Sequence, residues 1–208
     1  DRRQRQMCIR DRITTKPDHP ARLGLFIIVS FVTLWLSRWP LITGLVSAPD
    51  VDESVTGLLA MDILAGRWPG VFFPGQPFGL SLLEAVTVAL GFSVRGELDA
   101  TSLRHASAAL WSMSGVIMAL GVYHLRGLLL AAAFVGLFTL CPAWFEFSIK
   151  ARSGYLSALI FVAWSFLAAA SRQARPVPGD ARGAWWLVFA FSVTMTALSQ
   201  ALFVACLL

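Results

Sequence analysis

The feature that most constrains this chain is a series of long apolar runs, which approach or exceed the length that crosses a bilayer. A transmembrane helix needs about 20 predominantly apolar residues. Hydrophobic residues make up 57% of the 208 residues and charged residues only 14%, whereas an average soluble domain carries roughly 25% charged residues. The sequence therefore predicts an all-α, polytopic membrane protein rather than a soluble enzyme. About five spans are expected, at residues 23–46, 106–125, 128–144, 154–170 and 184–208.

The first twelve residues and the last seven residues of the chain are unusual for the ends of a membrane protein. Residues 1–12, DRRQRQMCIRDR, begin with Asp rather than Met and resemble a translated sequencing adaptor; the alternative is a basic cytoplasmic leader. Residues 13–22 are expected to be cytoplasmic, and residues 23–208 to form the membrane domain. Residues 202–208 end within an apolar run, where a helix would leave its last carbonyl groups in lipid. We therefore expect an N-terminal fragment of a longer protein.

The distribution of Lys and Arg predicts the orientation in the membrane. The net charge is +5, but basic residues beside apolar spans set orientation, so they do not indicate nucleic acid as a partner. Long loops and residues 1–12 are left out of the comparison. The remaining basic residues on the N-terminal side are Lys16, Arg22, Arg126, Arg172, Arg175 and Arg182, against Arg38, Lys150 and Arg152 on the other side. This excess predicts a cytoplasmic N-terminus in the inner (plasma) membrane, with membrane lipid as a partner.

The segment 47–105 is then a long outer loop, and it holds seven of the twelve acidic residues. Loops longer than about 15 residues are usually functional. Apolar residues between Val55 and Ile63 fall on one face at helical spacing, and Gly66 is placed to end that helix. A second short helix is expected over 78–92, and its polar stripe consists of Ser81, Glu84 and Thr87. Two helices lying in the membrane interface, apolar face down, explain both patterns.

Three carboxylates, Asp50, Asp52 and Glu53, follow the first span within four residues. One interpretation is helix capping, with Asp52 as the N-cap of a helix that starts at Glu53, because an acidic side chain satisfies free N–H groups there. Capping needs only one acid, so the cluster holds more carboxylates than this role explains. The other interpretation is a general base near the outer membrane surface, a role that carboxylates perform.

Residues 72–79, FFPGQPFG, predict a tight turn between the two expected loop helices, because Pro and Gly are the residues that turns favour. Gln76 is the only polar side chain in this segment. An ordinary turn explains the Pro and Gly residues but does not need Gln beside aromatic residues. Gln76 is therefore a candidate binding residue, with an ordinary turn as the alternative.

Residues 148–155, SIKARSGY, bring two cations and a tyrosine to the start of the fourth span: Lys150, Arg152 and Tyr155. Cations in a short outer loop oppose the positive-inside tendency. They can contact lipid headgroups, or they can form a phosphate clamp, because Arg binds phosphate through two parallel hydrogen bonds.

The sequence contains no motif for a cofactor. The three His residues are dispersed and lack the spacing of metal ligands. There is no phosphate-binding Gly loop, dinucleotide fingerprint or zinc motif. We therefore expect no cofactor and no metal site, while a requirement for a divalent metal stays open.

These motifs together resemble the GT-C superfamily of membrane glycosyltransferases, and most closely the bacterial group similar to dolichyl-phosphate-mannose-protein mannosyltransferases (protein O-mannosyltransferase-like). The resemblance covers roughly residues 23–170. The chain departs from the group at Ser54 and Val55, where an aromatic residue is frequent. The order that carries the resemblance is one span, Asp52-Glu53, an amphipathic helix ending at Gly66, FFPGQPFG with Leu83-Glu84, and Arg104 at the next span.

The resemblance implies transfer of a hexosyl or pentosyl group from a polyprenyl-phosphate sugar donor to an acceptor hydroxyl on the outer face of the membrane. It implies that Asp52 is the general base with Glu53 beside it. It also implies that Arg152, or alternatively Lys150, holds the donor phosphate. The other candidate substrate-binding residues are Tyr155, Gln76, Glu84 and Asp50. The sequence does not define the sugar or the acceptor, which could be a protein, a lipid or a glycan.

Two other functions stay open. One is a non-catalytic polytopic membrane protein, either a transporter or a scaffold. Transporters place functional charges near the middle of the membrane, whereas the apolar runs here hold almost no ionisable residue and the acids gather in one outer loop. The other is an inactive partial gene product.

Overall fold

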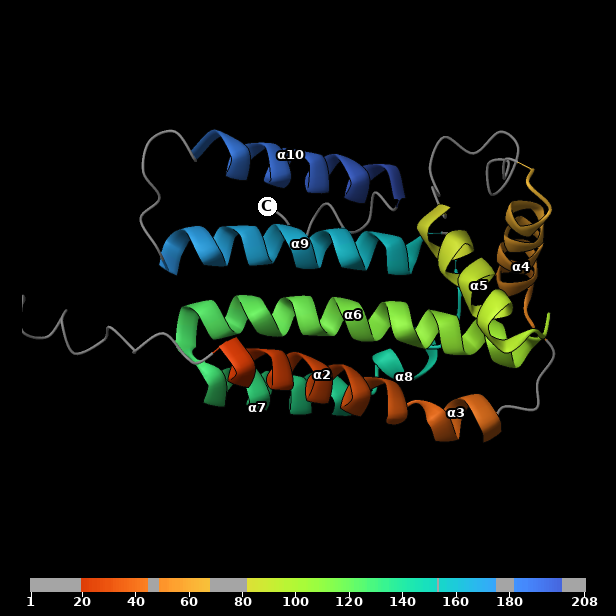
Figure 1. Ribbon diagram of the computed structural model, residues 1–208, viewed down its shortest axis with the longest axis horizontal. Helices are drawn as coiled ribbons and strands as arrows, with labels where there is room; N and C mark the ends of the chain where they lie inside the picture. Colours follow the sequence, from red (N-terminus) through yellow and green to blue (C-terminus); the bar gives the residue numbers. More distant parts are fainter. Residues whose placement is uncertain (1–19, 45–48, 68–81, 153, 175–181, 200–208) are drawn as a thin grey trace, which may run out of the picture.

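The computed structural model describes residues 20–44, 49–67, 82–152, 154–174 and 182–199 (Figure 1). The described part of the chain consists mainly of helices and holds no strand, which confirms the all-α prediction. The helices are α2 (Pro20–Leu36), α3 (Trp39–Gly44), α4 (Val51–Leu64), α5 (Leu82–Arg95), α6 (Ala100–Arg126), α7 (Leu128–Leu140), α8 (Trp144–Phe147), α9 (Tyr155–Ala174) and α10 (Arg182–Ser199).

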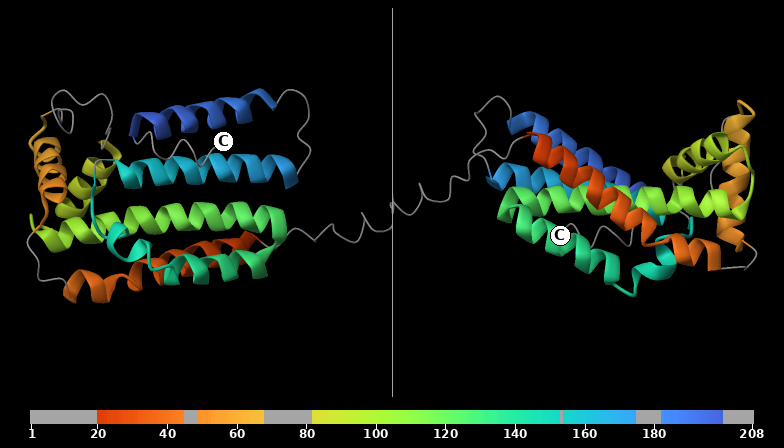
Figure 2. Two further views of the ribbon diagram at one scale, coloured as in Figure 1. Left: turned by 180° about the vertical axis from the view of Figure 1, so that it is seen from behind. Right: turned by 60° about the horizontal axis from the view of Figure 1, so that its bottom comes forward.

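The long helix α6 forms the centre of a bundle. It packs against α2, α7 and α9, and α10 packs on the far side of α9 (Figures 1 and 2). In the core, the fully buried Trp111 of α6 stacks on Phe138 of α7, with 4.8 Å between ring centroids. A Cβ atom at Gly115 would lie 2.7 Å from Phe138 and 2.9 Å from Leu34, so a glycine is what allows α2 and α7 to approach α6 here.

Three segments of the structure are long and apolar enough to cross a membrane: Pro20–Gly44, Ala100–Arg126 and Tyr155–Ala174. Their length and composition support a membrane protein. The apolar helices Leu128–Leu140 and Trp186–Ser199 are shorter. The first of these ends before Pro142, because a residue that precedes proline is driven out of the helical region, and Cys141 has φ −63° and ψ 115°.

The helix over the second apolar run begins earlier than the predicted residue 106. Asp99 caps α6, and its carboxylate accepts a 2.7 Å hydrogen bond from the N–H of Ser102. Capping by Asp is a strong helix start signal. Arg104 consequently lies inside the helix and is buried, rather than flanking it.

Two helices occur within the loop 47–105, as predicted, and they cross one end of the bundle (Figure 1). α4 ends at the expected glycine, because Gly66 has a φ of 71°. Buried Leu59 and Ala60 of α4 pack against Ala85 and Val88 of α5. The predicted turn 72–79 with Gln76, and residues 1–12, lie outside the described residues.

Arg38 follows the end of α2 and is buried, although long cationic side chains at the ends of membrane helices commonly extend to the membrane surface. Its guanidinium lies 4.2 Å from the Trp111 ring and 5.3 Å from the Phe145 ring. Its Nη2 donates a 2.9 Å hydrogen bond to the carbonyl of Thr139. Aromatic faces attract a desolvated cation, so the pocket formed by α6, α7 and α8 competes with solvent for this side chain.

Candidate functional site

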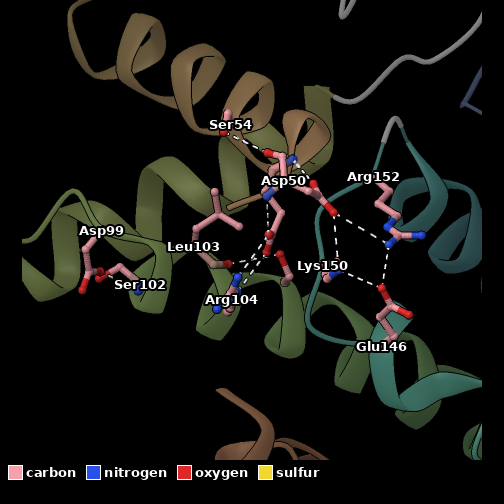
Figure 3. A network of polar contacts seen from close by, with 11 residues as sticks. Asp50, Ser54, Asp99, Ser102, Leu103, Arg104, Glu146, Lys150 and Arg152 are labelled. Atoms are coloured by element: carbon pink, nitrogen blue, oxygen red, sulfur yellow. Dashed lines mark hydrogen bonds and ion pairs between the residues drawn. The ribbon is translucent and has the colours of Figure 1, made fainter. Parts of the chain in front are cut away.

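The predicted site residues that the structure describes gather at the end of the bundle where α4 and α5 cross it. Figure 3 shows the N-terminus of α4, the first turns of α6, and the α8 segment with the chain that follows it meeting at this end. The charged side chains come from segments separated by about 50 to 100 positions in the sequence.

Asp50 caps α4. Its Oδ1 accepts a 2.9 Å hydrogen bond from the N–H of Glu53, and its own N–H donates a 3.1 Å hydrogen bond to Glu53 Oε2. This reciprocal pattern is a capping box. The prediction that Asp52 is the N-cap is therefore wrong. A capping box requires the acid to lie three residues after the cap, and the spacing Asp50-x-x-Glu53 already satisfies that rule in the sequence.

Glu53 and Arg104 form a buried ion pair that joins α4 to α6. Arg104 donates from Nε to Oε1 at 3.1 Å and from Nη2 to Oε2 at 3.3 Å. The exposed fractions of the two side chains are 1% and 3%. Two parallel hydrogen bonds compensate part of the cost of removing both charges from water. The predicted catalytic residue Glu53 is thus held by a structural contact, which no local pattern in the sequence signals.

Asp52 lies in the first turn of α4 and is partly exposed. Its backbone carbonyl accepts a 3.0 Å hydrogen bond from Thr56 Oγ1. Its carboxylate makes no hydrogen bond or ion pair with any residue that the structure describes. Because Asp50 performs the capping, the Asp52 carboxylate is left available for another role.

Lys150 and Arg152 approach the capping residue. Their nitrogens lie 3.5 Å and 3.7 Å from Asp50 Oδ2. Both also contact Oε1 of Glu146, which accepts hydrogen bonds from Lys150 Nζ at 2.7 Å and from Arg152 Nη2 at 2.8 Å (Figure 3). The hydrogen bond and charge of Lys150, together with the charge of Arg152, lower the pKa of Glu146. The hydrogen bond to Glu146 likewise raises the pKa of Lys150.

Aromatic rings flank the second cation. The Arg152 guanidinium lies 5.1 Å from the Phe147 ring, and the Phe147 ring centroid lies 6.1 Å from that of Tyr155. Cation–π attraction of this kind contributes about 0.5–1 kcal/mol at an exposed site. Tyr155 therefore belongs to the surroundings of Arg152 through Phe147.

Glu84 of α5 is buried against the N-terminus of α9. Its Oε1 accepts hydrogen bonds from the N–H groups of Leu156 at 2.8 Å and Ser157 at 3.1 Å. Its Oε2 is buried without a partner among the described residues. Burial raises the pKa of Glu84 to about 7, the backbone hydrogen bonds oppose this, and the charge of Asp52 adds to it. Glu84 thus links the two helices that border the site.

The structure brings Asp50, Lys150 and Arg152 into direct contact. Asp52 follows Asp50 by two residues in the sequence and takes no part in this contact. The described residues contain no group of three His, Cys, Asp or Glu side chains that could hold a metal ion. Sequence reasoning missed Glu146. Its spacing of four residues before Lys150, at which opposite charges can pair, is the signal that could have found it.

Two cavities lie away from these charges, toward the other end of α9. One, of about 420 Å³, is an open cavity bordered by α6, α7, α9 and α10, and Met118, Phe134 and Phe189 are among its lining residues. The other, of about 370 Å³, includes Arg172 and Trp186. Neither cavity is lined by a predicted site residue. Both are mainly apolar, as expected for surfaces that face lipid chains or further helices.

No family model, curated protein or solved structure matches this chain.

Proposed function

We propose that this chain is a membrane glycosyltransferase of the GT-C type, which transfers a sugar from a polyprenyl-phosphate donor to an acceptor hydroxyl, with Asp52 as the general base. One observation carries the proposal. Asp50 satisfies the N-terminus of α4, so the partly exposed Asp52 carboxylate has no structural partner among the described residues, and two cations contact the residue two positions before it.

The chemistry needs a base and a cationic site close together. Asp52 accepts the proton of the acceptor hydroxyl while the acceptor oxygen forms a bond to the anomeric carbon of the sugar. The bond from that carbon to the phosphate oxygen breaks, and the polyprenyl phosphate leaves with the electron pair. General-base assistance is typically worth ~10²–10⁴-fold. Arg152 and Lys150 stabilise the charge that develops on the phosphate.

The membrane arrangement follows from the same proposal. The three long apolar segments, together with α7 and α10, form five spans, with the N-terminus in the cytoplasm and the charged end at the outer face of the plasma membrane. α4 and α5 then lie in the outer interface. Support for this placement comes from the exposed Leu58, Met61 and Leu64 of α4, because an apolar helix surface of this kind is stabilised by lipid.

The proposal is tested by Asp52→Asn in protein expressed from its complete open reading frame. We expect release of polyprenyl phosphate to fall by about 100-fold or more, because Asn cannot accept the proton. The donors are a panel of polyprenyl-phosphate hexoses and pentoses, with a membrane extract as the source of acceptors. The matched control is Asp62→Asn, because Asp62 is another accessible carboxylate of α4 and pairs with Arg67, which lies beyond the end of that helix. Undiminished turnover in Asp52→Asn would disprove the assigned role.

A non-catalytic transporter or scaffold is the second candidate, and one observation favours it. Arg38 and Arg104 are buried within apolar segments long enough to span a membrane, and ionisable residues inside spans often mark transport pathways. Both arginines lie near the charged end, however, and Arg104 is paired with Glu53. If neither the wild type nor Asp62→Asn turned over any donor of the panel, this second function would be favoured.

A further inference from the structure

The position between the two cations is already filled by a carboxylate oxygen. Glu146 Oε1 lies 2.7 Å from Lys150 Nζ and 2.8 Å from Arg152 Nη2. These distances are shorter than the 3.5 Å and 3.7 Å that separate the same nitrogens from Asp50 Oδ2. The four side chains carry two positive and two negative charges. A phosphate can gain the full attraction of both cations only if one carboxylate withdraws.

The two carboxylates are held very differently. Asp50 is fixed, because its other oxygen caps α4 and its N–H is bonded to Glu53. Glu146 lies on α8, a helix of four residues, and its side chain is 58% exposed. Among the described residues, its carboxylate contacts only the two cations. Glu146 is therefore the carboxylate that can leave at low cost, since exposed ion pairs are individually weak.

The cations themselves would stay in place when Glu146 leaves. Asp50 continues to contact both of them. Arg152 also packs its guanidinium over the ring of Phe147, which is a contact that does not depend on a carboxylate. The exposed fractions of the Lys150 and Arg152 side chains, 18% and 25%, leave part of each accessible from outside.

From these contacts we infer that Glu146 is a gating residue: it occupies the anion position between Lys150 and Arg152 and is displaced when the phosphate of an isoprenyl-phosphate lipid binds there. This inference rests on the proposed function, because it assigns the ligand of the two cations. An oxygen of the phosphate takes the place of Oε1, and Glu146 turns toward solvent. The same carboxylate, on returning, competes with the polyprenyl phosphate product and promotes its release.

The inference predicts that removing the charge of Glu146 tightens phosphate binding. We expect Glu146→Gln and Glu146→Ala to bind citronellyl phosphate, a short soluble isoprenyl phosphate, about three- to ten-fold more tightly than the wild type, because two competing exposed ion pairs are lost. Binding is measured by titration calorimetry on the complete detergent-solubilised protein. Neutral citronellol should bind equally to all forms.

The matched control is Glu97→Gln, which removes an exposed carboxylate paired with Arg95 in the loop that leads to α6 and should leave the affinity unchanged. If Glu146 only held Lys150 and Arg152 in position, removing its charge would not strengthen phosphate binding. Unchanged or weaker binding in both variants would therefore overturn the inference. Inorganic phosphate is titrated in parallel. A gain confined to citronellyl phosphate supports a lipid ligand, whereas an equal gain with inorganic phosphate overturns the isoprenyl assignment.

This experiment and the Asp52→Asn assay can fail separately. Tighter binding in the Glu146 variants, combined with full turnover in Asp52→Asn, would support the gating role of Glu146 and disprove the role of Asp52 as the general base. Loss of turnover in Asp52→Asn, combined with no gain in affinity in the Glu146 variants, would support the glycosyltransferase activity and disprove the gating role of Glu146.

Discussion

Glu84 is a carboxyl group that the fold keeps away from water between α5 and α9. Burial raises its pKa from an ordinary value of 4.5 to about 7, even though the N–H groups of Leu156 and Ser157 favour the charged form. The folded protein therefore retains a proton on Glu84 over a pH range in which the unfolded chain has lost it. The free energy of unfolding consequently falls as the pH rises from 4.5 toward about 7, and the contribution of Glu84 is constant above that range.

We expect Glu84→Gln to remove this part of the pH dependence, because Gln is neutral at every pH and its carbonyl oxygen can still accept from α9. The slope removed is at most about 1.4 kcal/mol per pH unit. Thermal unfolding of the detergent-solubilised protein between pH 4.5 and pH 8 measures it. Glu97→Gln removes an exposed carboxylate that pairs with Arg95, and this variant should keep the wild-type slope. Identical slopes in the wild type and Glu84→Gln would show that Glu84 does not titrate in this range.

At the scale of the element, α4 positions the three carboxylates at its N-terminus, Asp50, Asp52 and Glu53. Its capping box fixes the first turn, and with it the direction in which Asp52 leaves the helix. Its last turn ends at Gly66, as the sequence predicts. Between the two ends, one set of side chains packs against α5 while Leu58, Met61 and Leu64 stay exposed. The cap and the surface packed against α5 together hold the Asp52 carboxylate at the end of the bundle.

The cap predicts a difference between two substitutions at one position. Asp50→Ala removes the hydrogen bond to the N–H of Glu53 and should destabilise the start of α4 by about 1 kcal/mol, whereas Asp50→Asn, a good cap, should retain most of that stability. Hydrogen exchange of the amides of Glu53 and Ser54 reports the effect directly. Equal protection in the two variants would mean that contact with Lys150 and Arg152, which both substitutions weaken, matters more than the cap.

At the scale of the whole molecule, the bundle and the α4–α5 pair are joined by the buried Glu53–Arg104 ion pair. Glu84 makes a second connection, to the N-terminus of α9. The two connections fix the candidate base relative to the helix that follows Lys150 and Arg152. Their burial makes them sensitive to the loss of a single partner, because the remaining charge is left in a medium of low polarity.

We expect Glu53→Met to destabilise the protein by about 3–5 kcal/mol, since it leaves the Arg104 charge buried without its carboxylate. The double variant Glu53→Met with Arg104→Met should recover much of this loss, because a pair of apolar side chains needs no counter-ion. A double-mutant cycle on thermal unfolding in detergent measures the coupling. Additive losses would contradict a direct pairing of the two side chains.

The sequence alone determined the helical class, the long apolar segments, the two helices inside the loop and the glycine that ends α4. These features follow from side-chain periodicity, backbone preferences and the cost of leaving peptide groups in lipid, all of which act within about 20 residues. The spacing Asp50-x-x-Glu53 also carried the capping box, although the prediction placed the cap at Asp52, before a helix expected to start at Glu53.

Only the tertiary structure decided which charges meet. Three contacts join segments that are far apart in the sequence: the pairing of Glu53 with Arg104, the contacts of Asp50 with Lys150 and Arg152, and the burial of Arg38 against Trp111. Such contacts depend on how helices cross and on how much water the packing excludes, and neither quantity is encoded by a local pattern. The same packing left the Asp52 carboxylate without a partner among the described residues, and this is the physical basis of its candidacy as the base.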